Sequence, residues 1–168
     1  MTKLTELDLE FDFSGAVNAY QFDSDELHGA STGQRVDFIA EYNDRYRFIE
    51  VKDPDHPEAT NPEAFVAKFS QEKLVNSLAG KFRDTFFFKT QCSEYDPNKK
   101  IDYIVLLSCA AIDDAMMLTK QDLLHRKIPI QHANWSGQPV ISCSLMNLQK
   151  YKQLFGEESI RRISEGAE

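Results

Sequence analysis

The stretch Arg35-Val-Asp-Phe-Ile-Ala-Glu-Tyr-Asn-Asp-Arg-Tyr-Arg-Phe-Ile-Glu-Val-Lys52 decides the fold. Its apolar and aromatic residues surround Asn43-Asp44, a pair typical of a tight turn, and predict two antiparallel strands. If these two residues form the loop, residues that face one another across the hairpin have numbers that sum to 87. Phe38 then lies opposite Ile49, and every other position in the two strands follows from this register.

The same register places Asp37 opposite Glu50, with Lys52 on the same face of the hairpin. Side chains directly opposite one another have Cβ atoms about 4.5–5.5 Å apart, a distance at which two carboxylates repel. Two carboxylates beside an ammonium group can hold a hard divalent cation such as Mg²⁺, with the lysine orienting or deprotonating a metal-bound water. Alternatively, the hairpin is a surface feature with Glu50 and Lys52 solvated, but this leaves Asp37 without a partner in an apolar strand.

This arrangement resembles the PD-(D/E)XK nuclease superfamily, which places an Asp on one strand and an (Asp/Glu)-x-Lys sequence on the next. Here Asp37 precedes Glu50-Val51-Lys52, and the apolar pair Phe48-Ile49 leads into the motif. The small-residue stretch Gly29-Ala-Ser-Thr-Gly33 resembles a loop of the Holliday-junction-resolvase branch. The resemblance covers about residues 25–88. It implies a restriction-endonuclease-like fold, Mg²⁺ or Mn²⁺ held by Asp37 and Glu50, and a catalytic role for Lys52.

Two further site residues are implied by the resemblance. Many members of the family carry an extra Glu on a helix before the Asp strand, and Glu26 is the candidate here, as a third metal ligand. The chain departs from the family in that its first twenty residues predict strands rather than a long helix. The helix after the Glu-x-Lys strand often brings a Gln or Lys to the site, and Gln71 takes that place. The alternatives are a surface turn for Glu26 and a backbone hydrogen bond for Gln71.

Composition describes a globular chain of 168 residues, with 42% hydrophobic residues and 12 Phe. The three cysteines have no Cys-x-x-Cys spacing, which argues against a zinc knuckle or an iron–sulfur cluster. The N-terminus has no signal-peptide pattern and no apolar run approaches the length of a membrane span, so we expect a cytoplasmic protein with reduced thiols.

The net charge of −8 bears on function, because nucleic-acid binding depends on neutralising phosphates. Residues 1–62 carry 14 acidic and 5 basic side chains, a net charge of −9, whereas residues 63–168 have a net charge of +1. We therefore expect weak binding of nucleic acid by the monomer alone, with a protein partner or homo-oligomerisation as possible sources of affinity, and no membrane partner.

The N-terminal residues alternate between apolar and acidic and predict a hairpin over about residues 4–22, with strands Leu7–Phe13 and Ala16–Phe22 joined at Ser14-Gly15. The acidic side chains then form a solvated outer face. After the central hairpin, Asp53 and its neighbours predict a proline-stiffened loop with ordinary acidic residues.

Asn61-Pro62-Glu63 is a strong helix start, and the helix should bury Leu74, Val75, Leu78 and Phe82 with Gln71 on the same stripe. Its lysines, Lys81 among them, either contact phosphate or form a solvated face. The apolar run from Lys100 to Ala110 predicts a buried central strand parallel to a neighbour. A second helix follows from Asp113-Asp114 to about Lys127.

A last strand over Pro139–Leu145, a closing helix over Asn147–Phe155 and a short charged tail complete the predicted chain. Trp135 lies in a polar loop, where it either anchors the loop or stacks on a base. We predict one α/β domain with a mixed central sheet of about six strands flanked by helices, restriction-endonuclease-like in arrangement.

Two functions follow from these expectations. The first is a divalent-metal-dependent nuclease, a hydrolase acting on phosphodiester bonds of DNA or RNA. The second is a catalytically inactive nuclease-fold module that serves as an interaction or accessory subunit, which the acidic N-terminal half and the missing first helix favour.

Overall fold

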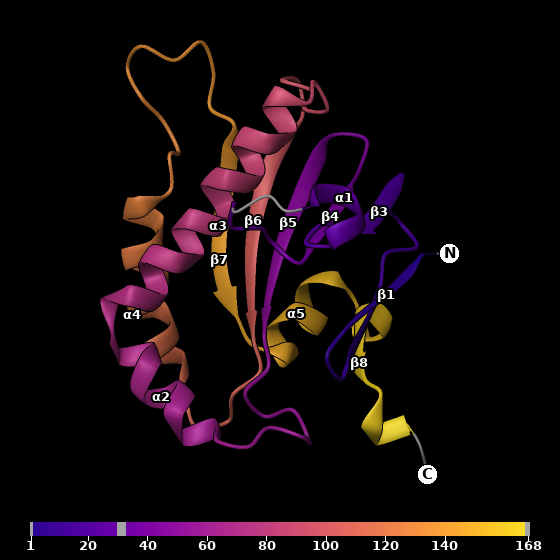
Figure 1. Cartoon of the computed structure of the whole chain (residues 1–168), viewed down its shortest axis with the longest axis vertical. Coiled ribbons are helices and arrows are strands. Elements are labelled where there is room, and N and C mark those ends of the chain that lie inside the picture. Colours follow the sequence, from indigo (N-terminus) through magenta and orange to yellow (C-terminus); the bar gives the residue numbers. More distant parts are fainter. Residues whose placement is uncertain (1, 30–32, 167–168) are drawn as a thin grey trace.

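The computed structural model describes residues 2–29 and 33–166. Its main sheet has five strands in the order β3-β4-β5-β6-β7, one fewer than the six expected. These strands are β3 (Asn18–Gln21), β4 (Phe38–Glu41), β5 (Arg45–Lys52), β6 (Lys100–Leu107) and β7 (Val140–Met146). The pairs β3–β4 and β4–β5 are antiparallel, while β5–β6 and β6–β7 are parallel, so the sheet is mixed as predicted. The fold is α/β (Figure 1).

A second, antiparallel sheet has the order β1-β2-β8. Its strands are β1 (Lys3–Glu6), β2 (Leu9–Asp12) and β8 (Ile160–Arg162), so it joins the two ends of the chain. The helices are α1 (Asp25–His28), α2 (Pro62–Ser70), α3 (Glu72–Gln91), α4 (Asp114–Lys127) and α5 (Leu148–Phe155), with short 3₁₀ turns at Glu157–Ser159 and Ser164–Gly166. None of the helices in the described ranges is long and apolar enough to cross a bilayer.

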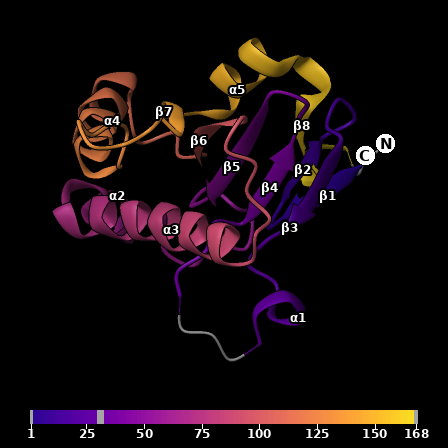
Figure 2. The ribbon, with the colours of Figure 1, turned by 90° about the horizontal axis from the view of Figure 1, so that it is seen from above.

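The five-stranded sheet has a buried core on each face. On one face, Ile39, Phe48 and Tyr103 pack against apolar residues of α3 and α4. On the other face, Phe38 and Ile49 pack against residues of the three-stranded sheet and α5. Figure 2 shows α3 and α5 on opposite sides of the sheet. Because strand side chains alternate between faces, residues of β5 with even numbers point toward α3.

The expected N-terminal hairpin over residues 4–22 is wrong. The chain turns at Leu7, which has a φ of 53° and is 55% exposed. β1 pairs with β2 across this turn, and Glu6 lies opposite Leu9 where the hairpin closes. β2 and β3 belong to different sheets, since β2 pairs with β8 and β3 with β4. The alternation of apolar residues identified the buried face correctly from Leu9 to Phe13, but alternation does not specify the partner strand.

Residues 157–166 form regular structure where a short charged tail was expected. Ile160 is fully buried, and β8 completes the three-stranded sheet. The helices α4 and α5 begin at the predicted caps, where the side chains of Asp113 and Asn147 accept hydrogen bonds from backbone N–H groups of the first turn.

The expected helix from residue 61 onward is two helices. The Asn61 side chain caps α2 as predicted, accepting a hydrogen bond from the Ala64 N–H at 3.0 Å. The backbone then becomes extended at Gln71, with φ −82° and ψ 148°, and α3 begins at Glu72. The apolar stripe of α3 packs on the sheet with Val75, Leu78 and Phe82 buried, but Gln71 precedes this helix and is not part of the stripe.

Candidate functional site

The hairpin formed by β4 and β5 has the predicted register. Phe38 pairs with Ile49 and Glu41 with Tyr46, so partner numbers sum to 87. Asp37 is the residue immediately before β4, at the position that faces Glu50. Its Oδ2 accepts a hydrogen bond from the backbone N–H of Val51 at 2.6 Å, which fixes the carboxylate against the neighbouring strand.

Both carboxylates are buried on the face of the sheet that α3 covers. Glu50 is fully buried and Asp37 is 5% exposed. Lys52, the last residue of β5, contacts Glu50 Oε1 with its ammonium group, while 30% of its side chain remains exposed. The sequence thus predicted three of the residues that come together here. Carboxylates with so little contact with water need nearby cations and hydrogen-bond donors.

The cation that joins the two carboxylates is Lys81 of α3. Its Nζ lies 2.6 Å from Glu50 Oε1 and 3.5 Å from Asp37 Oδ1. We call Asp37, Glu50, Lys52 and Lys81 the hairpin cluster. It contains two carboxylates and two ammonium groups, and only the lysines reach solvent appreciably, with 23% of the Lys81 side chain exposed.

Contacts between α3 and the segment that leads into Asp37 hold Lys81 in place. Thr85 Oγ1 accepts a hydrogen bond from the Val36 N–H at 3.1 Å, and Asp84 accepts one from the Gln34 N–H at 2.8 Å. Gly80 permits this close approach, because a Cβ there would lie 2.5 Å from Gln34 Oε1. The Gln34 side chain, in the segment before β4, therefore lies directly against α3 at the residue before Lys81.

The ionised forms of both carboxyl groups are disfavoured in the fold. Burial raises the pKa of Asp37, although Lys81 and the Val51 N–H oppose the shift. Burial also raises the pKa of Glu50, which Lys52 lowers and the charge of Asp37 raises further. For Lys81, burial lowers the pKa, but the two carboxylates more than offset this and the pKa is raised. The charged form of Lys81 is thus favoured in the fold, whereas the negative charges of the carboxylates are incompletely compensated.

Glu6 at the end of β1 adds a third carboxyl group near the cluster. Burial raises the pKa of Glu6 to about 7, and the negative charges of Asp37 and Asp23 contribute further. Sequence reasoning missed Glu6 because its expected position was in the strand segment 4–22, far from the central hairpin in sequence. No periodicity or motif links it to Asp37.

Gln71 and Glu26 are not part of the cluster. Gln71 is exposed at the break between α2 and α3, where its carbonyl accepts a hydrogen bond from Lys120 Nζ at 3.4 Å. Gln71 was misplaced because the helix is interrupted there, so spacing counted across the break has no meaning. Glu26 is exposed on α1 and forms no hydrogen bond or ion pair with another residue in the described ranges. Residues 30–32 of the expected small-residue loop lie outside the described residues.

Lys81 had a sequence signal that could have identified it. It lies three residues after Leu78 and four before Thr85, both of them buried, so it falls on the buried stripe of α3. A charged side chain on such a stripe requires a partner, and two carboxylates on the facing strands supply it.

A second group of charges lies on the opposite face, beside the end of β5. We call Asp8, Asp53, Arg162, Ser108 and Ser164 the arginine cluster. Arg162 contacts both Asp53 oxygens, at 2.6 and 3.0 Å, and Asp8 Oδ2 at 3.2 Å. Asp53 is therefore not an ordinary loop acid, and Asp8 is not part of a solvated face; both are buried.

The donor set of the hairpin cluster suits a hard divalent cation, because carboxylate oxygens are the ligands that Mg²⁺ and Mn²⁺ prefer. Asp37 Oδ1 and the Glu50 oxygens already converge on a cation, the Lys81 ammonium. Within residues 2–29 and 33–166, no set of three or more His, Cys, Asp or Glu side chains is arranged to hold a metal. A metal here would therefore have two carboxylates of the cluster as its protein ligands.

Comparison with known proteins gives no match for this chain among protein families, characterised proteins or solved structures.

Proposed function

We propose that this chain is a divalent-metal-dependent nuclease that hydrolyses phosphodiester bonds of DNA or RNA at the hairpin cluster. The observation that carries the proposal is the convergence of Asp37 and Glu50 on a single cation, Lys81, with Lys52 at the exposed side. The support is the Asp…Glu-x-Lys pattern on consecutive antiparallel strands, followed by a helix and a parallel strand. The resemblance to the PD-(D/E)XK superfamily rests on the same residues.

In this proposal Asp37 and Glu50 hold Mg²⁺ or Mn²⁺. When bound, the metal supplies an activated water and offsets negative charge on the scissile phosphate. The backbone N–H of Val51 binds Oδ2 of Asp37, so Oδ1 points toward the position that Lys81 Nζ takes 3.5 Å away. Binding requires the Lys81 ammonium to leave its position between the carboxylates, and its partly exposed side chain allows this movement.

The two lysines then have separate tasks. Lys52 is exposed enough to contact a substrate phosphate while its ammonium stays beside Glu50, so it can stabilise charge that develops on the phosphate oxygens. Lys81 would add a second positive charge beside the two carboxylates. A chain with a net charge of −8 needs such local cations to admit a polyanion.

Cleavage assays test the proposal. End-labelled single-stranded, double-stranded and branched DNA, together with RNA, are incubated with Mg²⁺ or Mn²⁺, and with EDTA as a blank. We expect metal-dependent cleavage that falls by about 10²–10³-fold in Lys52→Ala. Asp37→Asn should also be inactive, whereas Asp44→Asn, which changes an exposed acid at the tip of the same hairpin, should retain activity. Equal cleavage by the wild type and Lys52→Ala would assign the activity to a contaminant.

The second candidate is a non-catalytic accessory module. It is favoured by the complete burial of Glu50 and by the ion pairs that lysines of the chain itself form with both carboxylates. Under this alternative the cluster serves only to fix α3 on the sheet, and divalent metals neither bind nor stabilise the fold.

A further inference from the structure

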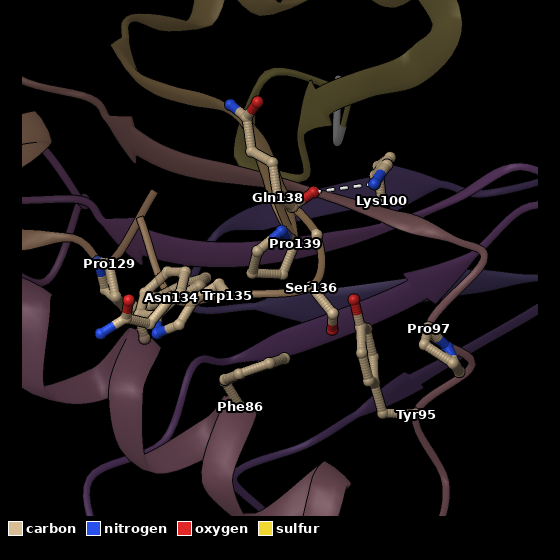
Figure 3. A pocket seen from close by; sticks show the side chains of 12 residues that line it. Phe86, Tyr95, Pro97, Lys100, Pro129, Asn134, Trp135, Ser136, Gln138 and Pro139 are labelled. Carbon is tan, nitrogen blue, oxygen red and sulfur yellow. Dashed lines mark hydrogen bonds between the residues drawn. The ribbon is translucent and has the colours of Figure 1, made fainter. Parts of the chain in front are cut away.

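A cavity lies at the other end of the sheet from the hairpin cluster. It has a volume of about 560 Å³, within the range of about 300–1,000 Å³ typical of small-molecule sites. Phe86 of α3 and Tyr95 of the following loop lie on one side, and the loop of residues 134–139 lies on the other (Figure 3). The pocket thus lies between the end of α3 and the loop that enters β7.

Four of the twelve residues that line the cavity are aromatic. The Phe86 and Tyr95 rings have centroids 5.1 Å apart at an interplanar angle of 80°, an edge-to-face arrangement that holds both rings in place. Trp135 faces the cavity from the loop and is 43% exposed. Trp135 lies in a polar loop, and its side chain is not part of the core on either face of the sheet. An aromatic side chain left open to solvent in a pocket offers a face on which a planar ring can stack.

Polar groups lie along the same cavity. The side chains of Asn134 and Ser136 form no hydrogen bond with any residue in the described parts of the chain, and both residues are exposed. An amide and a hydroxyl can each donate and accept, which suits the polar edge of a heteroaromatic ring. Lys100 Nζ donates to the Gln138 carbonyl at 2.8 Å and has no carboxylate partner among the described residues, so its positive charge is uncompensated.

We propose that this pocket binds a nucleobase, stacked on Trp135 with its polar edge toward Asn134, and that Lys100 contacts the attached phosphate. The claim that the base belongs to the strand being cleaved rests on the proposed function. The claim that the pocket binds a nucleotide does not depend on it. A nucleotide accounts for all three features together, because its base suits the stacking faces and the unpaired amide and its phosphate suits the uncompensated ammonium. A purely apolar ligand would leave the last two unused.

The register of β5 and β6 relates the pocket to the hairpin cluster. Lys100 pairs with Arg45 and Val105 with Glu50, so five residues along parallel strands separate the two sites. At about 3.3 Å per residue this is about 17 Å. The α3 helix borders both sites, since Lys81 and Phe86 are five residues, about 1.4 turns, apart on it. A single strand lying along this side of the molecule would place one base in the pocket and a phosphate several nucleotides away at the cluster.

Trp135 is the single tryptophan of the chain and reports directly on the pocket. The full chain is titrated with the four common nucleoside 5′-monophosphates, with ribose 5-phosphate and inorganic phosphate as controls that lack a base, and tryptophan fluorescence and calorimetric heat are recorded. We expect saturable quenching by at least one nucleotide and none by ribose 5-phosphate. Equal responses to both, or no saturable response to any nucleotide, would overturn the proposal.

Variants locate the ligand. By calorimetry, Trp135→Ala should weaken nucleotide binding by at least about fivefold, whereas Trp135→Phe, which keeps an aromatic face, should bind nearly as well as the wild type. Asn134→Ala, at an exposed position where folding is not at risk, should weaken binding by about fivefold. Unchanged affinity in Trp135→Ala and Asn134→Ala would place the nucleotide elsewhere and contradict the proposal.

Two comparisons separate this proposal from the proposed function. Asp37→Asn should bind nucleotides like the wild type. If the wild type binds nucleotides but cleaves no nucleic acid, the base pocket stands and the proposed nuclease function fails. A short single-stranded oligonucleotide that binds more tightly than the mononucleotide supports the strand as the source of the base. Tighter binding of the mononucleotide overturns that source and assigns the pocket to a free nucleotide.

Discussion

The hairpin cluster and the arginine cluster each contain two buried carboxylates, yet they differ in how those charges are stabilised. In the arginine cluster, Asp8 accepts hydrogen bonds from the Ser164 hydroxyl and backbone N–H, at 2.6 and 2.9 Å, as well as from Arg162. These donors lower the pKa of Asp8, with the Ser164 hydroxyl contributing most. In the hairpin cluster, burial raises the pKa of both carboxyl groups despite two lysines.

The difference lies in geometry. Arg162 presents a planar fork that contacts both oxygens of Asp53, and Ser108 Oγ accepts from the same guanidinium at 2.5 Å. Lysine ammonium groups are point charges on flexible side chains. They leave some of the hydrogen-bond-accepting positions of the carboxylate oxygens unused. The arginine cluster is therefore complete as it stands and fastens β8 to the end of β5. The hairpin cluster is not complete in this sense, because its carboxylates have unused capacity to accept. A site for a further cation requires such capacity.

The two clusters should also respond to pH in opposite directions. Because the folded-state pKa of Asp8 lies below the ordinary value of 3.8, ionised Asp8 stabilises the fold above that value, and the contribution is lost as the pH falls further. Asp37 and Glu50 have raised pKa values, so their ionisation costs stability as the pH rises above their unfolded values of 3.8 and 4.5. Acid should thus reduce the stability that the arginine cluster contributes, and it should remove the cost of ionising the carboxyl groups of the hairpin cluster.

The largest effect on stability should come from Arg162→Met. Removal of the guanidinium leaves the buried Asp53 carboxylate without its cation, and breaking a buried pair in this way costs about 3–5 kcal/mol of unfolding free energy. Arg161→Met is the matched control, because Arg161 forms an exposed pair with Glu10, and exposed ion pairs contribute little to stability. Urea denaturation measures both. Similar losses in the two variants would mean that the arginine cluster is not the structural fastening described.

Lys81→Met should cost somewhat less, about 2–3 kcal/mol at pH 8, because Lys52 still compensates part of the charge and the site is partly exposed. The loss should shrink toward pH 5, since the raised pKa values let the carboxyl groups take up protons. Lys73→Met, an exposed change on the same helix, is the control.

Lys81→Met also distinguishes a metal site from a purely structural pair. If the ammonium occupies the position of a metal, its removal should strengthen Mn²⁺ binding, and Mn²⁺ should restore much of the lost stability. A variant whose stability does not respond to Mn²⁺ would instead assign the cluster a structural role.

A smaller gain is expected for Glu6→Gln. The unfolded carboxyl group ionises near pH 4.5 but the folded one only near pH 7, so the wild type loses stability as the pH rises through this window. The variant lacks this loss and should be more stable at pH 8 by about 1 kcal/mol, a value reduced for solvent screening. Thermal melts at pH 4.5 and 8 measure the change, with the exposed Glu58→Gln as a control that should show none.

Local patterns predicted much of the fold and three of the four residues of the hairpin cluster. The hairpin register, the cap residues of α2, α4 and α5, and the buried parallel strand β6 all follow from turn chemistry, capping and apolar runs. These signals act between residues close in sequence. Asp37, Glu50 and Lys52 came together for the same reason, because a tight turn fixes which side chains share a face.

The errors concern partners that are distant in sequence. The pairing of β2 with β8 joins the two ends of the chain, and nothing local in the Leu9–Asp12 strand indicates it. The contact of Lys81 with the hairpin and the position of Glu6 depend on how α3 and the second sheet pack. Gln71 was misplaced because its own backbone is extended and separates α2 from α3. The polar residues around it give no sign of this break in the sequence.

The most direct test of the central claim is a thermal-melt titration of the wild type, Asp37→Asn and Asp44→Asn with Mg²⁺ and Mn²⁺. Without metal, Asp37→Asn should be as stable as the wild type or more so, because the change removes an ionisation that burial disfavours. With metal at a hundred times its dissociation constant, the wild type and Asp44→Asn should gain about 2.7 kcal/mol, and Asp37→Asn far less. A wild type whose melting temperature no metal changes, together with a clearly destabilised Asp37→Asn, would contradict the account and favour the accessory module.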